Sequence, residues 1–126
     1  MMEHNMIGWV EIPVTDMDRA KNFYEAVFNI TISIHDLGGF IMGWFPYEEG
    51  VKGISGSLVK HEMYQPSDHA GALIYFSCRD VAEEARRVMD AGGEVLREKT
   101  AIGEGHGYMA LIKDSEGNRI GLHSQS

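Results

Sequence analysis

The chain has 126 residues, and 19 Asp and Glu against 11 Lys and Arg give it a formal net charge of -8. This length fits one domain with a substantial core, and the acidic balance argues against nucleic acid and anionic membrane surfaces as main partners. The single cysteine, the absence of a signal-peptide pattern and the absence of a membrane-spanning apolar run favour a protein of the reducing cytoplasm.

The first predicted elements are a strand and a helix that follow each other directly over residues 7–28. In the strand, Val10 and Ile12 point to one side, while Trp9 and Glu11 point to the other. The helix starts at a Thr-Asp cap and carries an apolar stripe that can cover the valine side. A carboxylate beside an indole is unusual in a core, so the Trp9/Glu11 face is the first candidate for function.

The rest of the first half predicts three strands and then a segment without periodicity, which is read as a linker. These elements are strands at Ile30–Asp36, Phe40–Phe45 and Gly53–Val59, and the linker at Lys60–Gly71.

The second half repeats this order. It predicts a strand at Ala72–Cys78, a helix at Asp80–Ala91, a strand at Glu94–Arg97, a glycine-rich loop at Ala101–Gly107, and paired strands at Tyr108–Lys113 and Arg119–Ser124.

Sliding the first half by 64 residues puts Trp9 on Leu73 and Glu11 on Tyr75. Each half is therefore a βαβββ module: module one covers about residues 6–59 and module two about residues 72–126, joined by linker 60–71. The predicted fold is α+β, with the two paired modules forming a curved mixed sheet around a cleft and the helices outside. A cleft between duplicated modules is a good place for a ligand.

Three segments carry a resemblance to a known superfamily: PVTDMDRAKNFYEAVF, DVAEEARRVMDAGGEVL and DSEGNRIGLHS. In this order and spacing they resemble the vicinal oxygen chelate superfamily, which includes glyoxalase I, the bleomycin-resistance proteins and the extradiol dioxygenases. The resemblance implies a divalent metal held by His or Glu from the first and last strand of each module.

The four positions that the resemblance assigns to metal ligands carry no His, Asp or Glu here. They fall on Trp9, within Ser55–Ser57, on Leu73 and on Gly121. Trp, Leu and Gly cannot coordinate a metal through their side chains. We therefore expect no metal at the usual site and no cofactor; an unusual metal held by Glu11 and loose histidines stays open.

Three polar residues are candidates for chemistry. Glu11 and His123 each lie two residues beyond a lost ligand position, on the same inward face, and could act as an acid–base pair. His106 lies in the loop Gly103–Gly107, whose glycines suit a mobile lid. The alternatives are a strand carboxylate paired with a neighbour, a histidine at a dimer edge and an ordinary turn.

The remaining candidates form the walls of the cleft. The aromatic residues are Trp9, Trp44, Tyr75 and Tyr108, and Leu73 and Gly121 complete the predicted ligand-binding set. Aromatic walls suit a flat or cationic ligand, whereas the alternative is that these rings fill the space of the missing metal.

Two functions follow from these residues. The first is a binding protein similar to the bleomycin-resistance members, which takes a small polar or cationic aromatic molecule in a metal-free cleft, with Glu11 as the charge partner. The alternative is a divergent lyase or isomerase related to lactoylglutathione lyase, which uses Glu11 with His123 or His106 for proton transfer. The resemblance also implies a homodimer; whether the modules pair within one chain or between two stays open.

Overall fold

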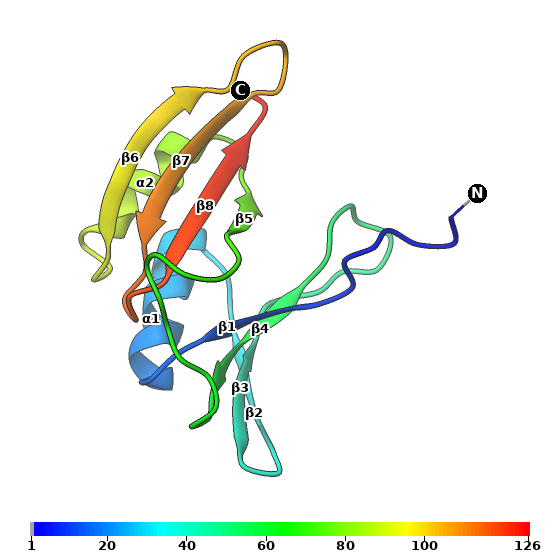
Figure 1. Cartoon of the computed structure of the whole chain (residues 1–126), viewed down its shortest axis with the longest axis vertical. Helices are drawn as coiled ribbons and strands as arrows, with labels where there is room; N and C mark the ends of the chain where they lie inside the picture. The colour runs from blue at the N-terminus through cyan, green and yellow to red at the C-terminus, as the bar shows by residue number, and fades with distance from the viewer. Residues whose placement is uncertain (1) are drawn as a thin grey trace.

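The computed structural model describes residues 2–126, which form two helices and eight strands. In chain order the elements are β1 (Val10–Pro13), α1 (Met17–Phe28), β2 (Ser33–Leu37), β3 (Phe40–Trp44), β4 (Gly56–Lys60), β5 (Ile74–Ser77), α2 (Val81–Val88), β6 (Glu94–Ala101), β7 (Tyr108–Lys113) and β8 (Arg119–Ser124). Each half has the order βαβββ, which confirms the predicted α+β fold (Figure 1).

Both helices begin after an aspartate cap; the sequence predicts the cap at Asp16 and predicts the start of the second helix at Asp80. The Asp16 carboxylate accepts a hydrogen bond from the Arg19 N–H at 3.0 Å, and the Asp80 carboxylate accepts one from the Ala82 N–H at 3.0 Å. Helix α1 ends at Asn29, which adopts the left-handed conformation with φ 56°. The observed boundaries differ most from the predicted ones at β6. This strand continues beyond Arg97 to Ala101, because it stays paired with β7 through two register shifts.

The eight strands divide into two mixed sheets of four with the same topology. Sheet 1 has the order β1-β4-β3-β2 and sheet 2 the order β5-β8-β7-β6. Glu11 pairs with Ser57 in sheet 1, and Tyr75 pairs with Gly121 in sheet 2, so the 64-residue offset of the sequence repeat holds at both strands of each pair. Within the described residues no hydrogen-bonded ladder joins the two sheets.

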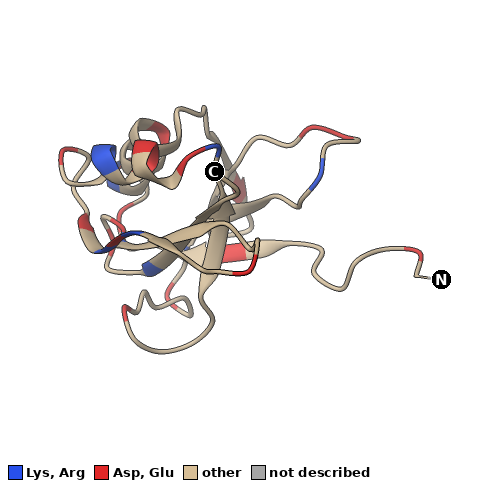
Figure 2. Ribbon diagram, turned by 90° about the horizontal axis from the view of Figure 1, so that it is seen from above, with Lys and Arg blue, Asp and Glu red and all other residues tan. Residues whose placement is uncertain are grey.

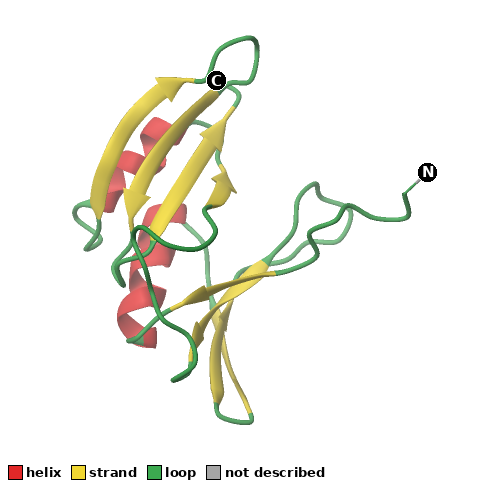
Figure 3. Ribbon diagram, in the orientation of Figure 1, coloured by secondary structure: helices red, strands yellow, loops and turns green. Residues whose placement is uncertain are grey.

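Helices α1 and α2 lie together on one side of the sheets, as Figure 3 shows. Phe23, Tyr24 and Val27 of α1 share one buried cluster with Val81 and Val88 of α2, and this cluster continues onto both sheets. Each sheet therefore has one face packed on helices and one face free of them. We call the second face of each sheet its open face.

A turn of module two fastens the modules to each other. The Glu116 carboxylate accepts hydrogen bonds from the backbone N–H groups of Thr15 and Asp16 at 2.9 and 2.8 Å, at the start of α1. In the same turn, Asp114 accepts a hydrogen bond from the buried Tyr24 hydroxyl at 2.6 Å. Asn118 donates to the Pro13 carbonyl at 2.7 Å. The DSEGN segment that supports the family resemblance is therefore also the clasp between the two halves.

Two segments extend away from this body in the same direction: the N-terminal arm and the loop between β3 and β4 (Figure 1). Both carry exposed apolar side chains. Met6 and Ile7 on the arm are 90% and 61% exposed, and Tyr47 and Val51 on the loop are 70% and 59% exposed. Such side chains gain from being covered by another surface.

Basic residues are scattered among acidic ones over the helices, strands and loops (Figure 2). This pattern differs from the continuous basic stripe with which proteins follow a nucleic-acid backbone. Over residues 2–126, neither helix has the length and apolar character that crossing a bilayer requires.

Candidate functional site

The open face of sheet 1 places a carboxylate at the centre of its first strand. Ile12 of β1 is buried on the helix side, so the side chain of Glu11 lies on the open face and is exposed. Its Oε1 accepts a hydrogen bond of 2.5 Å from the hydroxyl of Tyr64, which belongs to the linker between the modules. This hydrogen bond raises the pKa of Tyr64, because the phenol that donates it becomes harder to deprotonate. The partner of Glu11 is thus a neutral hydroxyl group.

Two polar residues of the neighbouring strands stand in line with Glu11. Ser57 of β4 pairs with Glu11 on one side and with Trp44 of β3 on the other. The Trp44 indole is stacked against the ring of His35, with 3.7 Å between the ring centroids and an interplanar angle of 26°. His35 lies 3.1 Å from the Ser33 hydroxyl. Glu11, Ser57 and Trp44 therefore form a row across the open face of sheet 1.

On the open face of sheet 2, a tyrosine ring of β5 packs on a glycine of β8. A Cβ atom added to Gly121 would lie 2.5 Å from the ring of Tyr75, so this ring covers the glycine closely. Farther along the same strand, the Nε2–H of His123 donates to the His106 carbonyl oxygen at 2.8 Å. His123 thereby fastens the loop that carries His106, while the His106 side chain is exposed.

The other predicted site residues have different surroundings. Trp9 precedes β1 and is 46% exposed, whereas Leu73 precedes β5 and is half-buried. Tyr108 lies on the helix side of sheet 2, where it packs on the core, and the Lys99 ammonium sits 4.6 Å from its ring centroid. Tyr108 therefore does not belong to the open face where the other candidates lie.

A cavity of about 590 Å³ lies between the free edges of β1 and β5, and it contains only two of the predicted residues, Leu73 and Tyr75. Aromatic rings from the helix side line it as well, namely Phe28, Phe45 and Phe76. The Phe76 ring contacts both of the others, with ring centroids 4.6 Å from Phe28 and 5.6 Å from Phe45. A second cavity, of about 520 Å³, brings Tyr75 and His123 to the open face of sheet 2.

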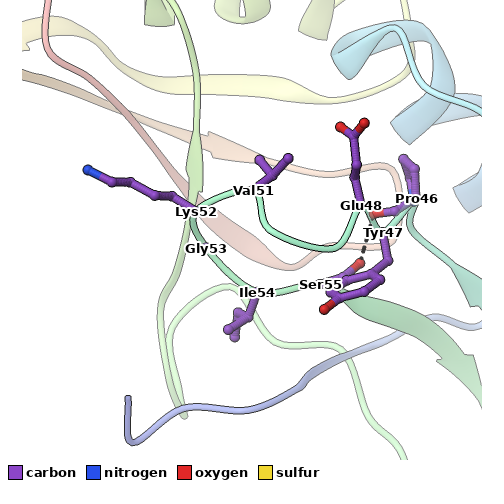
Figure 4. Close-up of a pocket in the computed structure, with 8 residues that line it drawn as sticks. All are labelled: Pro46, Tyr47, Glu48, Val51, Lys52, Gly53, Ile54 and Ser55. Atoms are coloured by element: carbon purple, nitrogen blue, oxygen red, sulfur yellow. Dashed lines mark hydrogen bonds between the residues drawn. The ribbon is translucent and has the colours of Figure 1, made fainter. Parts of the chain in front are cut away.

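A third cavity, of about 500 Å³, is formed by the loop between β3 and β4 alone and contains none of the predicted residues. Figure 4 shows its lining: Pro46, Tyr47, Glu48, Val51, Lys52, Gly53, Ile54 and Ser55. The Ser55 hydroxyl donates to the Pro46 carbonyl oxygen at 3.0 Å and holds the base of the loop closed.

The structure therefore brings some of the candidates together and leaves others apart. Glu11 and Trp44 share the open face of sheet 1, and Tyr75, Gly121 and His123 share that of sheet 2. Within the described chain, Glu11 has no hydrogen bond to His123 or His106. Sequence reasoning missed Tyr64 and His35, because neither the linker nor the second strand carries a motif. A single hydrogen bond from Tyr64 to Glu11 and a single ring contact between His35 and Trp44 leave no periodic signal in the sequence.

Cys78, the single cysteine, is packed on the helix side of sheet 2. Burial raises the pKa of its thiol to about 12, and the neighbouring Glu84 carboxylate adds to this effect. A thiol so resistant to ionisation is a poor nucleophile. Over residues 2–126 no three side chains of the His, Cys, Asp and Glu types gather in a geometry suited to a metal ion.

The fold defines a class of proteins built from tandem βαβββ modules, each with one sheet face free of helices. The sequence profile of the Glyoxalase/Bleomycin resistance protein/Dioxygenase superfamily matches residues 6–122. The chain belongs to this superfamily.

Several known proteins are similar to the chain. A glyoxylase-like domain-containing protein of Didymella fabae is 28% identical over 94% of this chain and 92% of its own length. Glyoxalase I from Zea mays superposes with a TM-score of 0.71 at 21% identity over 93% of this chain; the chain spans 45% of that enzyme. TnmS3, described as an antibiotic binding protein from Streptomyces sp. CB03234, superposes with a TM-score of 0.64 at 21% identity over the full length of both chains.

Proposed function

We propose that the protein binds a small polar or cationic aromatic molecule on its open sheet faces, without a metal ion. The observation that carries this proposal is the setting of Glu11. Its carboxylate lies exposed on an open face that also carries Trp44, and its hydrogen-bond partner is the neutral Tyr64 hydroxyl. A carboxylate without a cationic partner beside aromatic surface suits a positively charged ring system.

One structural neighbour supports a small-molecule ligand. TnmS3, which matches the chain over its whole length, is described as an antibiotic binding protein. Trp9, Leu73 and Gly121 stand where the superfamily resemblance places metal ligands, and they offer shape and apolar surface in place of coordination. The single, poorly ionisable cysteine fits our expectation of a cytoplasmic protein.

We also propose that the protein is a homodimer. The candidate residues are divided between two open faces, and β1 and β5 each leave one edge unpaired in the described chain. The arm and the β3–β4 loop add exposed apolar side chains to the same side of the molecule. A second copy would pair these edges, cover this surface and complete the site.

The ligand proposal is tested with a planar cation. Proflavine is titrated into the wild-type protein and into Glu11→Gln, with Glu49→Gln, another exposed carboxylate, as the matched control. We expect micromolar binding that weakens about tenfold in Glu11→Gln and is unchanged in the control, because the charge-assisted contact is lost. Absence of binding to the wild type at 1 mM proflavine would overturn the proposal.

The lyase or isomerase alternative is tested by measuring enzymatic turnover. Turnover of the hemithioacetal of methylglyoxal and glutathione is measured for the wild type, Glu11→Gln and His123→Ala. If the wild type turns the substrate over and both variants do not, the protein is an enzyme that uses Glu11 and His123 for proton transfer, and the binding proposal is wrong. Binding without turnover supports the binding protein.

The dimer proposal is tested by light scattering at micromolar concentration. We expect a mass about twice that of the 14.1 kDa chain, and a mass equal to one chain would overturn it.

A further inference from the structure

We infer that Ser57 and Trp44 form a pair of hydrogen-bond donors for an oxygen atom of the ligand. This inference rests on the proposed function and narrows the ligand class. The ligand would be a planar cation that also carries a carbonyl or similar acceptor oxygen. Glu11 would take the positive group, and the donor pair would take the oxygen.

The first observation is that these two side chains lack partners. Trp44 Nε1 and Ser57 Oγ are buried, and neither makes a hydrogen bond within the described chain. Buried polar groups are nearly always satisfied, so an unsatisfied pair calls for an explanation. The third such atom of the described chain, Glu84 Oε1, lies on α2, away from this face.

The second observation is their register. Trp44 and Ser57 are directly opposed on the antiparallel strands β3 and β4. Their Cβ atoms point to the same side, because Gly43 faces α1 and Leu58 is part of the core. Two donors on one face at this spacing can share one acceptor atom or bind the two lone pairs of a carbonyl oxygen.

The third observation is the place of Glu11 in the row. Glu11 is opposed to Ser57 on the other side, so the row reads carboxylate, hydroxyl, indole N–H across three adjacent strands. Neighbouring strands are about 4.8 Å apart, and the row therefore spans about 10 Å. This length matches a fused system of two or three rings with a cation at one end and an oxygen at the other.

Two side chains lie against the two ends of the row. The ring of His35 lies on the Trp44 indole, where the ring system of a ligand would stack. Tyr64 holds the Glu11 carboxylate. Both side chains are partly exposed, so rotation away from the sheet costs little burial.

The test uses two probes and one matched pair of variants. Daunorubicin joins a planar ring system with quinone oxygens to a cationic amino sugar, and proflavine is a planar cation without oxygen. Ser57→Ala removes the unpartnered hydroxyl. Ser55→Ala is the control, since Ser55 lies two residues before Ser57 and its hydroxyl already donates to the carbonyls of Phe45 and Pro46. Binding is measured by calorimetry, and stability by thermal unfolding.

We expect Ser57→Ala to weaken daunorubicin binding about tenfold, to leave proflavine binding unchanged and to keep or raise the melting temperature, because an unsatisfied buried hydroxyl is removed. Trp44→Phe should weaken daunorubicin binding similarly. Equal affinity of wild type and Ser57→Ala for daunorubicin would overturn the donor pair while the binding function stands. A melting temperature that falls as far as in Ser55→Ala would also overturn it. Failure of both probes to bind the wild type overturns the proposed function and the pair together.

Discussion

The two open faces share one backbone plan and differ in what fills them. In module one the β1/β4 pair carries Glu11 opposite Ser57, and in module two the β5/β8 pair carries Tyr75 opposite Gly121 at the same offset. The Tyr75 ring packs on the glycine, and its other side lines the cavity of about 520 Å³ on this face. The first face instead keeps a carboxylate and two unpartnered donors. The repeat therefore preserves the backbone geometry, while the side chains give one face a ring packed on a glycine and the other a carboxylate with two unpartnered donors.

The two open faces belong to modules that are joined by the clasp around Glu116. Glu116→Ala should lower the free energy of unfolding by about 3 kcal/mol, because two backbone N–H groups at the start of α1 and the Arg19 guanidinium lose their acceptor. Urea unfolding measures this change. Glu49→Ala, which removes an exposed loop carboxylate, is the control and should change stability by less than about 0.5 kcal/mol. A similar loss of unfolding free energy in both variants would show that the clasp does not stabilise the protein more than an exposed loop carboxylate does.

Acid should open the same clasp. Burial alone would raise the pKa of Glu116, but the hydrogen bonds from Arg19, Asp16 and Thr15 outweigh it and lower the pKa from 4.5 to about 2. Because the folded-state pKa is the lower one, this stabilisation is complete above pH 4.5 and disappears as the pH falls towards 2. We expect a loss of about 2 kcal/mol, less than the pKa difference alone gives, since Arg19 is half exposed and screened by solvent.

This acid effect is measured by urea unfolding between pH 5 and pH 2. In Glu116→Gln the dependence on pH over this interval should be smaller by about the same 2 kcal/mol. An equally steep loss in the variant would assign the acid sensitivity to other carboxylates.

The contact between Tyr75 and Gly121 in module two is tested by Gly121→Ala. The new methyl group would overlap the Tyr75 ring, so the ring must rotate away, at a cost of about 1 kcal/mol in the free energy of unfolding. Adding Tyr75→Ala should make the Gly121→Ala change nearly neutral, because the overlapping ring is gone. Gly8→Ala, where an added Cβ meets nothing within 4 Å, is the control. If the cost persisted in the absence of the ring, the contact would not be its cause.

The smallest expected effect concerns the polar face of module one. Tyr64→Phe removes the hydroxyl that occupies Glu11, so proflavine affinity should rise about threefold, while stability changes by less than about 1 kcal/mol. Calorimetry and thermal unfolding measure both quantities. Tyr47→Phe, at an exposed tyrosine of the β3–β4 loop, should change neither. Lower proflavine affinity in Tyr64→Phe would show that the hydroxyl assists binding.

Much of the fold could be predicted from local pattern. The alternation around Ile12, the cap at Asp16 and the turn before β8 each act within a few residues, and the structure confirms all of them. The candidate site was predictable only in part. Glu11 and Trp44 lie on the open face of sheet 1. Tyr108, in contrast, has the same orientation in β7 as the buried residues Ala110 and Ile112, and it therefore lies on the helix side of sheet 2.

The sequence by itself determined the duplicated α+β architecture, the superfamily and the lack of ligand-type side chains at three of its metal positions, because alternation, caps and residue identity are local properties. The tertiary structure decided which groups meet: that Tyr64 holds Glu11, that His35 covers Trp44, that Tyr75 fills the place of a side chain at Gly121, and that Glu116 joins the modules. These contacts form only when the folded chain brings the segments together, and the spacing of residues along the sequence does not indicate which side chains will meet.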